Sequence, residues 1–245
     1  MPHDRMQKQR FELRFQINDE TALLVRDFAR SYLDFDEHSF GKENFSYPVH
    51  SVYLDSDELK LYRDIVDDEK TNHHKLRLRY YDSKPDAPVY CEIKREINRC
   101  IFKQRACVRH ECVELLLKNH QPNPEHLASN EPNCLIGLQN FCHLARQIQA
   151  KPKVHIFHWR EAYLSDDNQC RLTLDRKVVS DAHLDYSIPT DVKAPRLMFS
   201  GQVILELKFT NRFPDWFREL IRVFGIIEWE GEGGKYRDAV ETIGL

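Results

Sequence analysis

The sequence lacks the features that mark membrane, secreted and repeat proteins. It contains no run of about 18 to 20 apolar residues, which a membrane-spanning helix needs. Its first residues, "MPHDRMQKQRFELRF", contain no apolar segment of a signal peptide, and this predicts a cytoplasmic protein. No internal repeat and no linker rich in Gly or Ser divides the 245 residues. One domain over residues 1–245 is therefore expected.

Two common kinds of site are also missing. The seven cysteines are scattered and include no C-x-x-C pair, so we expect reduced structural thiols and not a zinc site or a disulfide framework. The segment "GEGGK" does not complete a phosphate-binding P-loop, because Trp229 and Tyr236 stand where that motif requires Gly and Ser or Thr. A net charge of −3 argues against a general nucleic-acid binder.

The hydrophobic pattern predicts eight strands and several helices. Strands are expected over residues 9–17, 49–54, 74–82, 88–97, 100–109, 153–164, 170–179 and 202–210. Helices are expected over 20–33, with Asn18 or Asp19 as the cap, and over 57–65, 111–119, 134–149, 214–224 and from about 235. The Pro-rich segment 121–134 separates two of these helices. Strands in hairpin-like pairs favour an antiparallel α+β fold.

The stretch "HHKLRLRYYD", residues 73–82, has one strongly cationic face. Alternation places one set of side chains on each side of this strand: Lys75, Arg77, Arg79 and Tyr81 against Leu76, Leu78 and Tyr80. Charges two residues apart on a strand lie about 6.5 to 7 Å apart and repel by roughly 2 kcal/mol at an effective dielectric near 20. Acidic neighbours or an anionic ligand must offset this repulsion.

The same alternation of an apolar and a charged face recurs in other strands. The charged faces carry Arg10, Glu12 and Arg14; Glu92, Lys94 and Glu96; Lys103 and Arg105; Arg171, Thr173 and Asp175; and Glu206 and Lys208. One interpretation is an antiparallel sheet with a solvated face. The other is an eight-stranded barrel with the charged faces inside, where Arg and Lys with a few carboxylates suit a linear triphosphate or polyphosphate with Mg²⁺ or Mn²⁺.

A set of motifs in fixed order extends over nearly the whole chain. They are "RFELRF", "SVYLDSDELKLYRD", "HKLRLRYYD", "CEIKRE", "FKQR", "HWREAY", "RLTLDRKV", "VILELKF", "PDWFREL" and "GGKYRDAVE". In this set the sequence resembles the VTC domain, the polyphosphate polymerase domain of the vacuolar transporter chaperone complex and a member of the triphosphate tunnel metalloenzymes. The resemblance implies an eight-stranded antiparallel β-barrel, a tunnel with flanking helices, whose basic walls bind polyphosphate.

The resemblance also implies roles for single residues in transfer of the γ-phosphoryl group of ATP to a polyphosphate chain. The residues implied to act on the transferred phosphates are Lys94, Arg77, Arg79, Lys208 and Arg160. Those implied to bind the chain are Arg10, Lys75, Lys103, Arg105, Arg171 and Lys235. Glu206 and Glu12 are implied to hold Mn²⁺ or Mg²⁺. The chain departs from the family at Gly234, where members often have Ser, at the acidic Glu232, and in lacking a clean E-x-E-x-K on the first strand.

Two alternative functions stay open at this point. One is a hydrolase of the same fold that cleaves triphosphate or polyphosphate with water. The other is a non-catalytic module that only binds polyphosphate. Nucleic acid is not an expected partner, because the basic residues alternate with apolar ones along strands. A membrane partner and the oligomeric state stay open.

Overall fold

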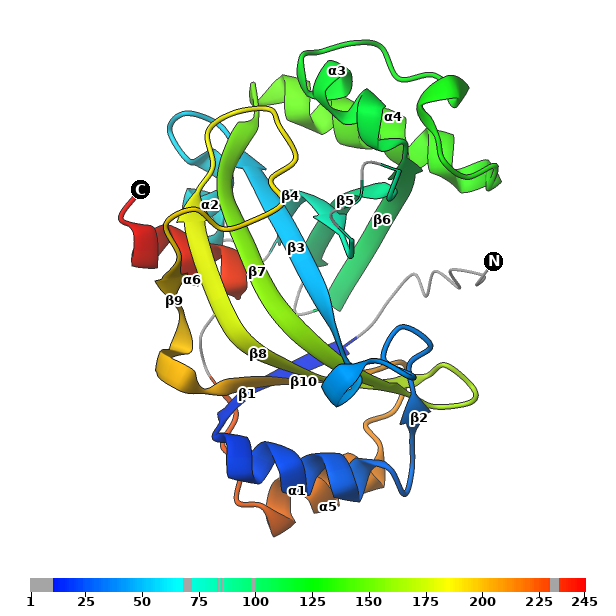
Figure 1. Ribbon diagram of the computed structural model, residues 1–245, viewed down its shortest axis with the longest axis vertical. Helices are drawn as coiled ribbons and strands as arrows, with labels where there is room; N and C mark the ends of the chain where they lie inside the picture. The colour runs from blue at the N-terminus through cyan, green and yellow to red at the C-terminus, as the bar shows by residue number, and fades with distance from the viewer. Residues whose placement is uncertain (1–10, 68–71, 83, 85, 98–99, 230–233) are drawn as a thin grey trace.

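The computed structural model describes residues 11–67, 72–82, 84, 86–97, 100–229 and 234–245. Its main feature is one strongly curled antiparallel sheet (Figure 1). Eight strands follow one another in the order β1, β10, β8, β7, β3, β4, β5, β6. Their bounds are β1 (Phe11–Ile17), β3 (Ser46–Asp55), β4 (Asn72–Tyr80), β5 (Val89–Ile97), β6 (Cys100–Val108), β7 (Lys151–Leu164), β8 (Cys170–Ala182) and β10 (Val203–Phe209). All eight were expected from the sequence, each within three residues at either end.

Two short strands were not predicted from the sequence. β2 (Asp34–Phe35) pairs with β7, and β9 (Arg196–Leu197) pairs with β8. Each has only two residues, too few for an alternating pattern to be visible. β2 also explains why the first helix is shorter than expected, since turns that return to Ala29 lead the chain into this strand.

Helices flank the sheet at its outer surface and at one end. They are α1 (Asp19–Ala29), α2 (Lys60–Val66), α3 (Val113–Leu117), α4 (Pro132–Gln147), α5 (Asp215–Val223) and α6 (Lys235–Ile243), with 3-10 turns η1 (Glu43–Phe45), η2 (His110–Cys112), η3 (Pro124–His126) and η4 (Phe199–Gly201). The Asn18 side chain caps α1 by accepting a hydrogen bond from the Thr21 backbone at 2.7 Å, as expected. No helix of the described residues is both long and apolar enough to cross a membrane.

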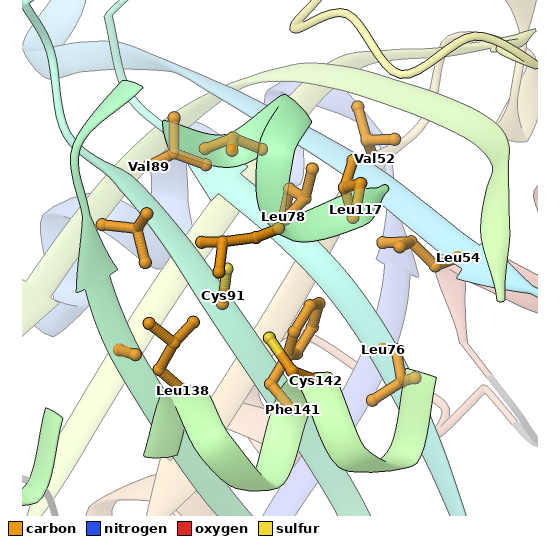
Figure 2. Close-up of a cluster of buried hydrophobic side chains, with 14 of the residues drawn as sticks. Val52, Leu54, Leu76, Leu78, Val89, Cys91, Leu117, Leu138, Phe141 and Cys142 are labelled. Carbon is orange, nitrogen blue, oxygen red and sulfur yellow. The ribbon is translucent and has the colours of Figure 1, made fainter. Parts of the chain in front are cut away.

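The outward face of the sheet is apolar and packs on two pairs of helices. α3 and α4 cover β4, β5 and β6, where Leu138 and Phe141 meet Leu76, Leu78 and Cys91 (Figure 2). α1 and α5 cover the other end of the strand order, over β1, β8 and β10 (Figure 1). Burying this face between helices and sheet leaves the charged face turned toward the inside of the curl.

The curl brings the two ends of the strand order together. β1 and β6 lie close to each other, yet no backbone pairing joins them within the described part of the chain. A side-chain bridge spans this seam instead: Lys94 of β5 lies 3.1 Å from the carboxylate of Glu12 on β1. The expected barrel is thus present as a curled sheet that its backbone does not close.

α6 closes one end of the space inside the curl. Tyr236 of α6 stacks on the inward-facing Tyr53 with ring centroids 4.9 Å apart, and Ala239 and Val240 pack with Ile204. The α6 helix is anchored to β3 by a buried hydrogen bond, because the Tyr236 hydroxyl donates to Asp55 at 2.7 Å. Its first residue, Lys235, is held next to the charged face.

Candidate functional site

The curled sheet encloses a cavity of about 340 Å³, here called the central cavity. Its cationic lining comes from seven strands and α6, and consists of Arg14, Lys75, Arg77, Arg79, Lys94, Lys103, Arg105, Arg160, Arg171, Lys208 and Lys235. Four carboxylates also line it: Glu12, Asp36, Glu37 and Glu206. The interpretation with inward charged faces is therefore confirmed, and the solvated-face alternative is wrong for these strands. Positive charge prevails strongly inside the cavity.

A buried carboxylate behind one wall organises its basic residues. Glu92 is fully buried, 2.7 Å from the Arg77 guanidinium and 2.6 Å from the Lys103 ammonium. Although burial opposes its ionisation, Lys103 and Arg77 hold the pKa of Glu92 well below its ordinary value. Arg105 lies 3.5 Å from the same carboxylate and stacks over the Tyr90 ring at 3.5 Å. Several cations on β4 and β6 thus share one negative charge.

Asp175 has the corresponding role on the opposite wall. Both nitrogens of the Arg160 fork donate to it at 2.7 Å, and the Lys235 ammonium lies 2.7 Å away. Burial opposes ionisation here too, but Arg160 outweighs it and lowers the pKa of Asp175. A bidentate pair fixes the plane of the guanidinium, so Arg160 is held in one orientation at the cavity wall.

Arg79 is a buried cation of the cavity whose direct hydrogen-bond partner is a neutral hydroxyl. Its side chain is buried, with 7% of the residue exposed, and its guanidinium donates to the neutral hydroxyl of Ser51 at 3.1 and 3.3 Å. Within the described residues it forms no ion pair. Burial and the nearby charge of Arg77 lower the pKa of Arg79. A buried cation without a carboxylate partner is costly, which points to an anionic ligand at this position.

Glu12 and Glu206 form the acidic part of the central cavity. Glu206 accepts from Lys235 at 2.8 Å and from Lys208 at 2.5 Å, and Glu12 pairs with Lys94 and with Arg14 at 2.9 Å. Despite burial, the surrounding ammonium groups hold the pKa of both carboxyls below the ordinary value. Both are therefore ionised at neutral pH.

Glu12 and Glu206 could hold a divalent cation that is also bound by the phosphates of a ligand. No three His, Cys, Asp or Glu side chains of the described residues are grouped as a metal site. Mg²⁺ is commonly held by one or two carboxylates together with substrate phosphates. Glu12 and Glu206, on neighbouring strands, supply that number of carboxylates, so they fit an ion shared with a bound phosphate chain.

Three lysines of the cavity lose their protons unusually easily. Burial, followed by the charges of Lys94 and Arg14, lowers the pKa of Lys75 to about 7. Burial also lowers the pKa of Lys103 to about 7 and that of Lys208 to about 8, although Glu92 and Glu206 act in the opposite direction. A bound anion restores the charge of such groups, because it favours the protonated form.

Apart from Arg10, the structure brings the predicted site residues together around one cavity. Arg10 and Glu232 lie outside the described residues. The analysis of the sequence did not assign roles to Arg14, Glu92 and Asp175, although their strand alternation placed all three on charged faces. It also missed Tyr53, whose hydroxyl accepts from Arg77 at 3.2 Å. No local sequence pattern distinguishes Tyr53 as the partner of an arginine on another strand.

The fold and the cavity define a class: a curled antiparallel sheet that encloses a cationic tunnel suited to an elongated anion. The family model described as VTC domain matches residues 9–243. The chain therefore belongs to the VTC domain family.

Solved structures with a similar fold come from distant sequences. A Bacillus halodurans protein provisionally described as an adenylate cyclase has a TM-score of 0.54 and 15% identity, with 94% of this chain and 98% of that chain covered. A Pyrococcus horikoshii OT3 protein has a TM-score of 0.45 and 13% identity, with 95% and 98% covered. No curated protein matches the chain significantly. At such identity the first likeness supports the fold alone.

Proposed function

We propose that this chain is a polyphosphate polymerase, which transfers the γ-phosphoryl group of ATP to the end of a polyphosphate chain in the central cavity. The observation that carries this proposal is the buried Arg79, which forms no ion pair with the residues that the structure describes, within a lining of eleven cations. A chain of phosphates supplies many negative charges in a narrow, linear form. Membership of the VTC domain family supports the same substrate class.

Different residues of the cavity have different roles in the reaction. Arg77, Arg79 and Lys94 bind the transferred phosphates. Arg160 and Lys208 face the opposite side of the cavity and stabilise charge on the attacking and leaving oxygens. Because Asp175 already fixes the Arg160 guanidinium, little reorganisation is needed when charge develops.

The remaining cations hold the polymer. Five of them line the cavity and bind successive phosphates: Lys75, Lys103, Arg105, Arg171 and Lys235. No protein nucleophile is required, because a terminal phosphate oxygen of the acceptor attacks the γ-phosphorus and ADP leaves. Glu12 and Glu206 would hold Mn²⁺ or Mg²⁺, which supplies further positive charge to the phosphates when bound.

Incubation of the purified protein with ATP and Mn²⁺ tests the proposal. We expect chains of increasing length and matching release of ADP, both lost in Glu206→Gln. Glu219→Gln, an exposed carboxylate on α5, is the matched control and keeps the activity. Phosphate without longer chains would assign a hydrolase instead. Binding of polyphosphate with no turnover of ATP would assign a non-catalytic carrier.

A further inference from the structure

Gly234 has a backbone conformation that only glycine adopts readily. It precedes α6 with φ 64° and ψ −169°, a region of backbone conformation that residues with a side chain adopt only under strain. A β-carbon built at this position would also lie 2.5 Å from Nη1 and 2.9 Å from Nη2 of Arg14. The absence of a side chain at Gly234 thus leaves the space that the Arg14 guanidinium fills.

In that space Arg14 lies between the two carboxylates of the cavity. Its Nη2 donates to Glu12 at 2.9 Å and its Nε is 3.8 Å from Glu206. The Arg14 side chain is only 18% exposed, and those of Glu12 and Glu206 are 7% exposed. Although burial opposes the charged form, both carboxylates raise the pKa of Arg14, so the guanidinium stays charged.

The backbone fixes Arg14 from a second side. Its carbonyl accepts a hydrogen bond from Trp229 at 2.9 Å, and its neighbour Phe15 forms a β-bridge with Glu228. The chain after α5 therefore adds to the edge of β1. The main chain of Arg14 is thus fixed at this edge. Its guanidinium lies against the backbone of Gly234.

We infer that Arg14, admitted by Gly234, is an internal cation that binds Glu12 and, together with Lys208 and Lys235 at Glu206, excludes a divalent ion until a phosphate chain draws the guanidinium away. A guanidinium binds phosphate bidentately, so an incoming chain offers Arg14 a partner equivalent to the carboxylates it leaves. Anion binding thereby precedes metal binding. The inference rests on the proposed function for the identity of the anion, but its statement about Mn²⁺ concerns the free protein.

Calorimetric titration with MnCl₂ alone, without phosphate, tests the inference on the full chain. Wild type is expected to bind Mn²⁺ weakly, and Arg14→Gln at least tenfold more tightly with one ion per chain. Adding Glu206→Gln to Arg14→Gln abolishes the gain. Gly234→Ala, which displaces the guanidinium, gives a gain of the same sign. Arg14→Gln does not alter the backbone at residue 234, so its Mn²⁺ affinity still tests the inference if Gly234→Ala does not fold.

Arg171→Gln is the matched control for the Mn²⁺ titration. It removes one positive charge from the same cavity, but Arg171 pairs with Asp36 at 3.0 Å and not with Glu12 or Glu206. Equal Mn²⁺ affinity in wild type and Arg14→Gln, or an equal gain in Arg171→Gln, overturns the inference. A separate titration of tripolyphosphate in the presence of EDTA tests anion binding. Failure there contradicts the proposed function and leaves the Mn²⁺ result standing.

Discussion

Lys94 of β5 donates to both carboxylate oxygens of Glu12 on β1, at 3.3 and 3.1 Å. This contact joins the first strand of the order to the second-last one, beside the seam where the described residues show no backbone pairing between β1 and β6. Both side chains are largely buried, with 16% of Lys94 and 7% of Glu12 exposed. An ion pair screened from water interacts more strongly than a surface pair.

This relationship predicts a measurable coupling across the seam. In a double-mutant cycle of Lys94→Met and Glu12→Gln, followed by urea unfolding, we expect a coupling free energy of about 1 to 3 kcal/mol. The same cycle on the exposed pair Lys118 and Glu114 of α3 is expected to give about 0.5 kcal/mol or less. Equal values for the two pairs would show that the seam contact does not hold the sheet together.

The low lysine pKa values predict that anion binding weakens as the pH rises. Lys75 and Lys208 have pKa values of about 7 and 8, so both lose their charge between pH 6 and 9. One charge about 5 Å from a phosphate is worth about 3 kcal/mol at an effective dielectric near 20, so tripolyphosphate is expected to bind at least tenfold more weakly at pH 9 than at pH 6. Lys75→Arg keeps its charge and is expected to flatten the profile. An unchanged profile in that variant would contradict the assignment.

The lowered pKa of Lys75 also predicts that the free protein becomes more stable as the pH rises, whereas anion binding becomes weaker. The pKa of Lys75 is lower in the folded state than the ordinary value of 10.5. Between about pH 7 and pH 10.5, the folded and the ordinary pKa of Lys75, the unfolded chain binds more protons than the folded chain. The contribution of Lys75 to the free energy of unfolding therefore increases as the pH rises through this range. Chemical unfolding at several pH values, compared with Lys75→Met, isolates this contribution. It is expected to disappear in the variant.

A fourth prediction concerns Glu92, the buried carboxylate behind the β4 and β6 wall. Glu92→Gln leaves the buried Arg77 and the half-buried Lys103 without their shared counter-charge, which is expected to cost about 3 kcal/mol of stability. Saturating tripolyphosphate replaces that charge, so its stabilising effect in a thermal melt is expected to be larger for the variant than for wild type. Asp215→Asn, a surface carboxylate on α5, serves as the control with little effect.

The sequence predicted the walls of the tunnel better than its ends. Period-2 alternation specifies which side chains of a strand share a face, so Lys75, Arg77 and Arg79 could be placed together from sequence alone. The amphipathic helices could also be predicted, because a helix with one buried face shows apolar residues at helical spacing. Alternation alone, however, did not determine whether the charged faces point inward, which depends on the curl of the whole sheet.

Contacts between distant segments account for most of what the sequence did not predict. Glu92 and Asp175 have low pKa values because of cations from other strands and from α6, and no local pattern reveals these partners. The sequence analysis singled out Gly234, but only the position of Arg14 in space explains what a glycine does there. The seam contact between Lys94 and Glu12 likewise requires the three-dimensional arrangement of two strands.

A fifth prediction tests how α6 is fixed at the end of the tunnel. The Tyr236 hydroxyl donates to the fully buried Asp55, whose carboxylate otherwise accepts from backbone groups of α2. Tyr236→Phe removes this donor while keeping the ring that stacks on Tyr53, and it is expected to cost about 1 to 3 kcal/mol in urea unfolding. Because Lys235 directly precedes Tyr236, polyphosphate affinity is also expected to fall.

Tyr62→Phe is the matched control for this prediction. Its hydroxyl lies 3.4 Å from the exposed Glu241, so its removal is expected to change stability by less than about 0.5 kcal/mol and to leave polyphosphate affinity unchanged. If Tyr236→Phe lowered stability but not polyphosphate affinity, α6 would be a structural plug whose position does not affect the cavity. A parallel loss of both would show that the Asp55 hydrogen bond holds Lys235 in place against Asp175 and Glu206.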